Sequence, residues 1–215
     1  ERYDGYGNSI RRVMEQKKNE PGIKGVVADI IHVQKDYEVA IETALGGSIQ
    51  NIVTDNEQTA KRMIGFLKKN RYGRATFLPL SNISGRGGLN QRDVLQEPGV
   101  IGTANTLVKA DDEYSELVMY LLGRVLVVDD IDHAIAIGKK YRHSLRMVTI
   151  EGESLSPGGS MTGGAFKNNS NLLGRRREIE ELERSVGILK KELEETQKAI
   201  GENRSKRNVL RDAIA

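Results

Sequence analysis

The chain has 215 residues, and its 33 lysines and arginines against 30 aspartates and glutamates give a net charge of +3, which indicates no particular class of partner. It contains no cysteine, which excludes disulfides and cysteine-based zinc sites and fits a reducing compartment such as the cytoplasm. No apolar run approaches the ~18 residues of a membrane span, so no membrane partner is expected. Because the chain begins at Glu1 without methionine and ends inside a helical pattern, we expect a segment of a longer protein.

A short helix is predicted over residues 8–19, where Val13 and Met14 fall on one apolar side. Ser9 is the predicted N-cap, and Glu20-Pro21-Gly22 ends the helix. A helix of this length has little stability of its own, so it needs packing against the rest of the chain.

An internal repeat follows this helix. Glu20-Pro-Gly-Ile-Lys-Gly25 recurs 77 positions later as Glu97-Pro-Gly-Val-Ile-Gly102, and the same spacing brings Tyr37 onto Tyr114. Two unrelated units could resemble one another by chance, but the same six-residue pattern in register favours a duplication.

Each copy is predicted to contain a strand, a helix that ends at a glycine, a second strand, an amphipathic helix and a last strand. In the first amphipathic helix, Thr54 and Glu57 have capping-box spacing, and apolar residues recur at helical spacing from Ala60 to Leu67. This alternation predicts a mixed α/β (α+β) fold of two pseudo-symmetric duplicated subdomains, each with its own core. The predicted segments are 26–31, 37–45, 51–54 and 75–78 in the first copy, and 125–129 and 147–150 in the second.

The segment between the copies, residues 80–96, contains Ser84-Gly85-Arg86-Gly87-Gly88. Clustered glycines and polar residues are typical of exposed loops. We predict a mobile loop there and assign it no chemistry.

A second glycine-rich stretch, Ser156-Pro-Gly-Gly-Ser-Met-Thr-Gly-Gly164, permits three interpretations. A phosphate-binding loop is disfavoured, because no lysine occurs between Lys140 and Lys167 and the stretch does not lead directly into a helix. A plain flexible loop is possible. We favour a surface where another backbone approaches closely, because glycine leaves room for it.

Residues 167–174 are predicted to form a polar hinge before a long charged helix. Its apolar residues recur at heptad spacing, which indicates a coiled coil, although a solvated single helix can show a similar pattern. The a positions are Ile179, Val186, Leu193, Ile200, Arg207 and Ile214, and the d positions are Leu182, Leu189, Thr196, Asn203 and Leu210.

No catalytic or metal-binding residue is assigned. His32, His133 and His143 lack metal-ligand spacing. The carboxylates of Asp129, Asp130 and Asp132 follow a strand, as they sometimes do in α/β enzymes, but capping of the next helix by Asp130 or Asp132 is the simpler reading.

Basic residues are clustered and could bind phosphates without reading base sequence, although a solvated charged face would look the same. No acidic residue occurs from Gln58 to Arg92. The candidate DNA contacts are Lys68, Lys69 and Arg71 in this stretch, and Lys167, Arg175, Arg176 and Arg177 at the start of the long helix.

These features together resemble the hinge of bacterial structural maintenance of chromosomes (SMC) proteins. The resemblance covers about residues 20–177. The stretches that carry it are Gly22-Ile-Lys-Gly25, Tyr37-Glu-Val-Ala-Ile-Glu-Thr-Ala-Leu-Gly46, Gly73-Arg-Ala-Thr-Phe-Leu-Pro-Leu80, Leu122-Gly123, and Arg146-Met-Val-Thr-Ile-Glu-Gly152 through Gly164.

The resemblance implies a two-fold homodimer in which the first half of one chain pairs strand edges with the second half of the other. Gly158, Gly159, Gly163 and Gly164 match the family's interface glycines. It also implies DNA contact near the arm junction, a nucleoid-associated role in chromosome condensation and segregation, and an antiparallel upstream arm as partner of the long helix. No cofactor is expected in this segment, whereas ATP and Mg²⁺ belong to distant head domains.

The expected division is therefore 1–19 for the end of the upstream arm, 20–96 and 97–166 for hinge subdomains I and II, and 167–215 for the junction and descending arm. Two alternatives remain at this stage. One is an α/β enzyme or ligand-binding domain tethered to a coiled coil, and the other is a monomeric nucleic-acid binder.

Overall fold

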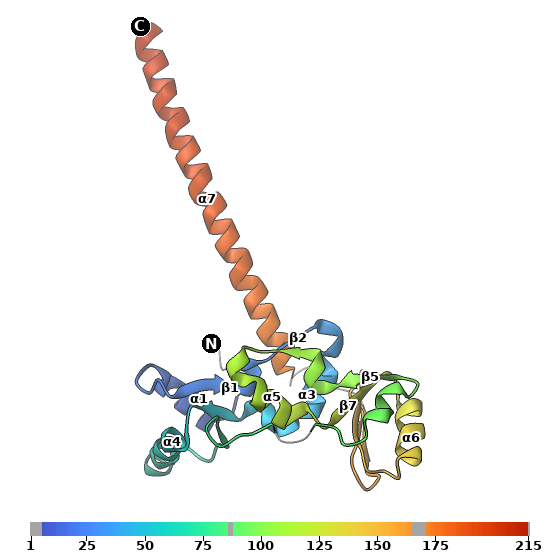
Figure 1. The fold of residues 1–215 in the computed structure, drawn as a ribbon. Coiled ribbons are helices and arrows are strands. Elements are labelled where there is room, and N and C mark those ends of the chain that lie inside the picture. Colours follow the sequence, from blue (N-terminus) through green and yellow to red (C-terminus); the bar gives the residue numbers. More distant parts are fainter. Residues whose placement is uncertain (1–5, 86–87, 165–170, 215) are drawn as a thin grey trace. The chain divides into compact units, whose positions relative to one another are not determined.

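A computed structural model describes residues 6–85, 88–164 and 171–214 of the chain. The chain divides into a compact body, Glu1–Gly174, and a second unit, Arg175–Ala215, which is helical through Ile214 (Figure 1). No helix in the described ranges is long and apolar enough to cross a membrane.

The two copies of the repeat build the body with the same order of elements. The first copy, with the helix that precedes it, contains α1 Asn8–Glu15, β1 Ile23–Val26, α2 Val27–Ile30, β2 His32–Val33, α3 Glu38–Leu45, β3 Ile52–Thr54, α4 Glu57–Asn70 and β4 Phe77–Pro79. The second contains β5 Val100–Thr103, β6 Val108–Lys109, α5 Ser115–Leu122, β7 Val125–Val128, α6 Ile131–Lys140, β8 Arg146–Thr149, β9 Ser154–Leu155 and β10 Met161–Thr162, and α7 Leu172–Ile214 follows.

The sheets confirm the duplication. The first sheet has the order β1-β3-β4 and the second β10-β9-β8-β7-β5. The strand that opens each copy, β1 or β5, runs antiparallel to its neighbour, β3 or β7, with an irregularity next to a repeat glycine, Gly25 or Gly102. The next pair in each sheet, β3 with β4 and β7 with β8, is parallel. β2 and β6 join the copies, and His32 pairs with Lys109, its own counterpart 77 positions later. The copies are therefore related by a local pseudo-two-fold.

The repeated Pro-Gly turn has a steric cause. The Gly22 carbonyl accepts a hydrogen bond from the Asp55 N–H at 2.9 Å, and the Gly99 carbonyl accepts one from the Asp129 N–H at 2.9 Å. A Cβ at Gly22 would overlap the side chains of Asp55 and Thr59, and a Cβ at Gly99 would overlap those of Asp129 and His133. Each copy needs glycine here because the end of the second strand lies directly against it.

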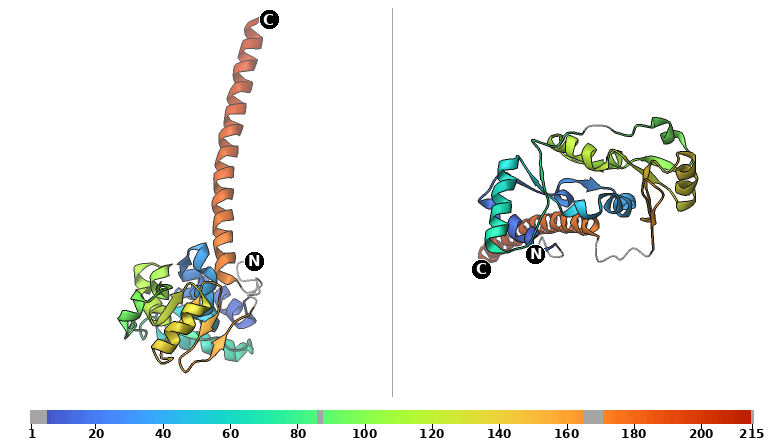
Figure 2. Two further views of the ribbon diagram at one scale, coloured as in Figure 1. Left: turned by 90° about the vertical axis from the view of Figure 1, so that its right-hand side faces the viewer. Right: turned by 90° about the horizontal axis from the view of Figure 1, so that it is seen from below.

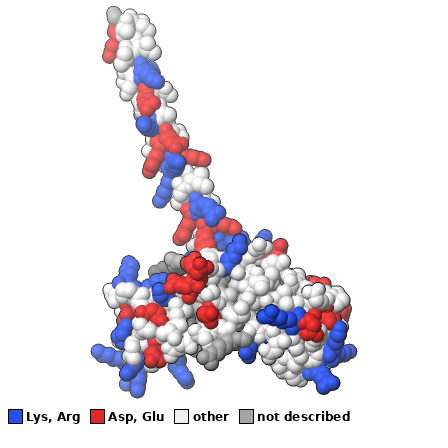
Figure 3. Space-filling model, viewed as in Figure 1, with Lys and Arg blue, Asp and Glu red and all other residues white. Residues whose placement is uncertain are grey.

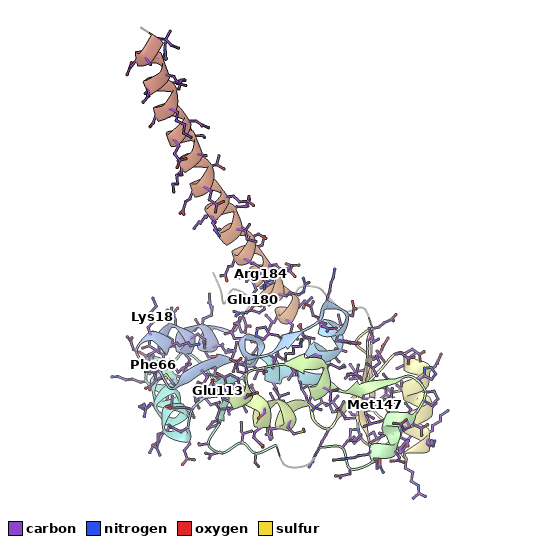
Figure 4. All side chains as sticks on the ribbon, turned by 45° about the horizontal axis from the view of Figure 1, so that its top comes forward. Lys18, Phe66, Glu113, Met147, Glu180 and Arg184 are labelled. Atoms are coloured by element: carbon purple, nitrogen blue, oxygen red, sulfur yellow. The ribbon has the colours of Figure 1, made fainter. Side chains whose placement is uncertain are left out.

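The prediction of a separate core in each half is wrong. The main core combines residues of the first copy, such as Ile41 and Ile52, with residues of the second, such as Leu117 and Val127. A second core lies between α6 and its sheet and includes Met147 of β8. α4 and α6 occupy opposite ends of the body in perpendicular views (Figures 1 and 2), and Phe66 of α4 and Met147 of β8 mark these ends in Figure 4.

The predicted strand over residues 26–31 is also wrong. β1 spans Ile23–Val26, and Val27–Ile30 forms a single helical turn, α2. Because Val27, Ala28 and Ile30 are all buried, the apolar run carries no periodicity that separates a buried strand from a buried helical turn.

Two predicted helix caps are corrected. α1 begins after Gly7, and the Ser9 hydroxyl, inside the helix, donates to the Arg74 carbonyl at 2.7 Å. α4 is capped by Asn56, whose side-chain oxygen accepts from the N–H groups of Gln58 and Thr59, rather than by Thr54. Asn56 satisfies two of the unpaired N–H groups of the first turn.

The segment expected to be an exposed, mobile loop and the one expected to be a polar hinge both contribute to the core. Within the predicted mobile loop, Arg92–Gln96 forms a 3-10 turn that buries Val94 completely, and the Gly85 N–H donates to the Glu116 carboxylate. α7 begins at Leu172 inside the predicted hinge, and Leu172 and Leu173 are buried. Asn171 caps this start, because its side-chain oxygen accepts the Gly174 N–H at 2.7 Å.

Candidate dimer interface and nucleic-acid surface

The glycine-rich stretch forms the β9–β10 hairpin at one end of the second sheet. Met161 of β10 lies opposite Leu155 of β9. Gly158 and Gly159 form the turn, where the Gly158 N–H donates to the His143 carbonyl at 2.8 Å. The stretch is therefore an ordered edge of the sheet and not a phosphate-binding loop before a helix.

The four candidate interface glycines have different local reasons to be glycine. Gly158, Gly159 and Gly164 have φ angles of 91°, 93° and 128°, which side chains rarely permit. Gly163 has no such angle, and a Cβ there would lie 3.0 Å from the Cγ of Glu153, whose carboxylate accepts a hydrogen bond from the Thr149 hydroxyl. An interface role for the four stays a prediction, and Gly163 is the position that tests it best.

β4 and β10 end their sheets with an open edge. Each has a neighbouring strand on only one side in the described part of the chain. By contrast, 3-10 turns pack against β1 and β5, the other two end strands. Unpaired strand edges present rows of N–H and C=O groups that can pair with another chain.

The second copy shows how the edge of β4 can be covered. β8, the counterpart of β4, pairs with β9 on the side away from β7. In the first copy the Ile52 N–H donates to the Thr76 carbonyl and the Leu80 N–H to the Thr54 carbonyl, so the Phe77 peptide groups face outward. Pro79 completes β4, and proline in a sheet is typical of an edge strand.

The structure separates the predicted basic residues of α4. Basic side chains gather at the end of the body where α4 lies (Figure 3). Lys68 and Arg71 line a hollow of about 560 Å³, whereas Lys69 is exposed and not part of this lining. A DNA contact at these three residues stays a prediction.

The arginines of the predicted arm junction lie in α7 and do not form one cationic face. The Arg176 guanidinium pairs with Glu180 at 2.7 Å, and that of Arg177 with Glu181 at 2.9 Å. Arg175, Arg176 and Arg177 are successive helical residues, so their side chains leave the axis about 100° apart. Lys167 lies outside the described residues.

The acidic cluster after β7 caps α6. The Asp130 carboxylate accepts the His133 N–H at 2.8 Å, as predicted for Asp130 or Asp132. Side-chain atoms of Asp129, Asp130 and His133 lie within 4.8 Å of one another. The first copy repeats this geometry with Asp55, Asn56 and Thr59, in which no histidine is present. The repetition favours a structural role over catalysis or metal binding, and sequence spacing alone had missed the convergence of His133.

One pH-dependent effect is predicted at this cap. The hydrogen bond between His133 Nδ1 and Asp129, 2.9 Å long, raises the pKa of His133 above its usual 6.5. Because the folded pKa is the higher one, the stabilisation is complete below about pH 6.5 and is lost as the pH rises through the folded pKa. In an NMR titration, Asp129→Asn should lower the pKa of His133. Asp132→Asn removes the same charge three residues further on, in the first turn of α6, and should lower the pKa less; equal shifts would contradict this account.

Comparisons with known proteins agree with this geometry. A family model described as the SMC proteins Flexible Hinge Domain matches residues 20–138. The chromosome partition protein Smc of Lactiplantibacillus plantarum is 40% identical over 196 residues, which cover 90% of this chain and 16% of that protein. Its counterpart in Bacillus subtilis is 42% identical over 202 residues, 89% of this chain and 17% of that protein. The chain therefore spans about a sixth of the length of these relatives.

Solved structures give the same result. The Geobacillus stearothermophilus SMC hinge domain, solved as an asymmetric dimer, has a TM-score of 0.79 and 38% identity, covering 95% of this chain and 83% of that one. The Pyrococcus furiosus Smc hinge domain with an extended coiled coil has a TM-score of 0.62 and 32% identity, covering 92% and 74%. The duplicated fold, the terminal hairpin and the family match agree, and the chain belongs to the SMC hinge domain family.

Proposed function

We propose that this segment is a non-enzymatic dimerisation module that joins two long coiled-coil arms of a chromosome partition protein. The observation that carries the proposal is the pair of open edges, β4 in the first copy and β10 in the second. In a two-fold dimer, β4 of each chain pairs with β10 of the other. The two equivalent contacts cover all four open edges, so no further chain can add to them. The alternative of a tethered α/β enzyme has no comparable support from the related proteins.

The related proteins support this reading in two ways. The Geobacillus stearothermophilus hinge domain was solved as a dimer. The Pyrococcus furiosus hinge domain was solved with an extended coiled coil, as α7 would provide here. The distant heads, their ATP and Mg²⁺, and a cytoplasmic, nucleoid-associated location belong to the proposed parent protein.

Mass in solution as a function of concentration tests the proposal. Sedimentation equilibrium should give twice the chain mass at micromolar concentration, with dissociation only on strong dilution. A chain that stays monomeric throughout this range would contradict the dimer and leave a monomeric nucleic-acid binder as the better reading.

DNA contact is the second part of the proposal, centred on Lys167 and Arg175–Arg177. Arg177–Glu181 is the more exposed of the two Arg–Glu pairs of α7, and exposed helix pairs of this spacing are worth roughly 0.3–0.5 kcal/mol, so a phosphate can compete with Glu181. With about three or four phosphates engaged, log K against log salt should have a slope of roughly −2 to −4. Arg175→Glu, Arg176→Glu and Arg177→Glu together should nearly abolish binding and leave the dimer intact, as measured by fluorescence anisotropy and sedimentation.

A matched control separates this contact from a general charge effect. Arg184→Glu, Lys190→Glu and Lys191→Glu make the same charge change further along α7 and should weaken binding less. Unchanged affinity in the first triple variant would place the DNA contact elsewhere, with the basic residues of α4 as the next candidate.

A further inference from the structure

A hollow of about 530 Å³ lies where the end of α5 meets the beginnings of β7 and β8. Residues 88–91, from the segment that joins the two copies, and Pro157 beside the hairpin turn complete its lining. We name it the α5 hollow. Leu121 on its lining packs against the main core, whereas Leu89 and Leu145 pack with the second core. The hollow therefore lies at the boundary between two cores, and ligand pockets often lie at boundaries between packed units.

Both charged residues of this lining are arginines. Arg124 follows α5, and Arg146 begins β8. The Arg146 guanidinium donates one hydrogen bond to the Ala44 carbonyl of α3 at 2.8 Å, which holds the side chain in place. Because a guanidinium has five N–H donors, Arg146 retains donors for a ligand. Within the described part of the chain the lining contains no carboxylate, so the hollow favours an anion, and planar guanidinium groups suit phosphate oxygens.

Two side-chain amides of the joining segment also line the α5 hollow. Across the described ranges, the Asn90 side chain makes no hydrogen bond and that of Gln91 makes one, to the Ser144 hydroxyl at 3.3 Å. Donors and acceptors therefore remain on both amides for a ligand. Amides of this kind pair with the N6 and N7 positions of adenine, so they suit the polar edge of that base.

Tyr120 supplies an aromatic surface that the shared fold does not require. Its side chain is 57% exposed, although α5 also supplies Leu117 and Leu122 to the main core. The 77-residue spacing brings Thr43 of the first copy onto Tyr120, and the smaller Thr43 hydroxyl donates to the Gly152 carbonyl at 3.5 Å. An exposed ring on the lining of a cationic hollow offers a flat surface on which a nucleobase can stack.

We propose that the α5 hollow binds a nucleoside phosphate, with adenine as the preferred base. The base stacks on Tyr120, its polar edge meets the amides of Asn90 and Gln91, and Arg124 and Arg146 hold the phosphate. The volume of about 530 Å³ lies within the range of small-molecule sites, roughly 300–1,000 Å³. All of these residues belong to one chain, so the inference does not depend on the dimer proposed above.

Titration calorimetry of the whole chain with AMP, adenosine and inorganic phosphate tests the inference. AMP should bind at least tenfold more tightly than either adenosine or phosphate, because each of these offers only half of the ligand. Tyr120→Ala should weaken AMP binding about fivefold or more, and Tyr120→Phe should retain it because the stacking ring remains. Arg124→Gln with Arg146→Gln should remove the preference for AMP over adenosine.

Two controls separate binding in the hollow from other effects. Arg92→Gln removes an exposed arginine of the joining segment that lies outside the lining, and it should bind AMP as the wild type does. Arg124→Gln alone leaves the Arg146 contact with Ala44 in place, so a weaker affinity for AMP at an unchanged Tm would not be explained by misfolding.

A free nucleotide and the last unpaired nucleotide of a DNA strand offer the same chemistry, and a competition experiment distinguishes them. A single-stranded oligonucleotide of adenines is titrated against a fluorescent analogue of AMP. If the oligonucleotide binds more tightly than AMP and Tyr120→Ala weakens both, the site is supported and a strand is its occupant. If AMP binds at least as tightly, a free nucleotide is the occupant. The inference is overturned if neither ligand binds, or if Tyr120→Ala binds both as tightly as the wild type.

Discussion

A Gly163→Val chain is expected to be a folded monomer. Gly163 directly follows the open strand β10, and its backbone conformation permits a side chain. Within one chain a Cβ at Gly163 lies 3.0 Å from the Glu153 Cγ, so the Glu153 side chain must shift by a few tenths of an ångström, and we expect only a small loss of stability. In the dimer they enter the space that β4 of the partner needs, once at each symmetric contact. We expect the dissociation constant to rise at least about a hundredfold, or about 3 kcal/mol, in sedimentation equilibrium.

Two other glycines complete the test. Gly47→Val adds a side chain in open space, where its Cβ meets nothing within 4 Å, and should leave the dimer unchanged. Gly159→Val is not a clean test, because a φ of 93° strains the turn with or without a partner. A Gly163→Val dimer as tight as the Gly47→Val dimer would show that the edge of β10 is free of protein contact.

The second large effect concerns α7. Its apolar seam is open in this chain, with Leu182 65%, Leu189 62% and Leu193 57% exposed. A facing helix would bury these side chains at about 1.5–3 kcal/mol each. Extending the chain by about thirty upstream residues, which form the antiparallel arm in this account, should therefore raise helicity and Tm. Thr196, Asn203 and Arg207 interrupt the apolar seam, so the gain should come mainly from its first half.

The seam itself supplies the control. Leu182→Asp with Leu189→Asp in the extended chain should remove most of the gain, whereas the same pair in the present chain should change Tm little. An extended chain with neither added helicity nor a higher Tm would contradict the antiparallel arm and favour a solvated single helix.

The repeated elements could be predicted because their signals are local. Gly46 follows α3 with a φ of 50°, as expected for a glycine that ends a helix. The 77-residue spacing carried α3 onto α5 and predicted the pseudo-symmetry. The boundary between β1 and α2 could not be predicted, because the apolar residues Val27, Ala28 and Ile30 are all buried and show no period.

The candidate dimer interface was harder to predict from the sequence, because it depends on pairing between segments that are far apart in the chain. Glycine in the hairpin indicated close backbone contact, but only the φ angles separate Gly163 from Gly158 and Gly159. The basic run after Gln58 predicted phosphate binding. The sequence pattern did not show that Lys68 and Arg71 line a hollow whose lining does not include Lys69. Buried Leu172 and Leu173 are an apolar pair inside a polar segment, a signal that could have placed the start of α7 earlier.

Cross-linking between chains tests the central claim most directly, because the chain has no cysteine of its own. Thr76→Cys places a thiol at the exposed start of β4, and Thr162→Cys places one on exposed β10. With a short bis-maleimide, each variant alone should stay largely uncross-linked, and an equimolar mixture should give a covalent dimer that contains one chain of each. A mixture that gives no mixed dimer, while the wild-type chain sediments as a dimer, would contradict pairing of β4 with β10.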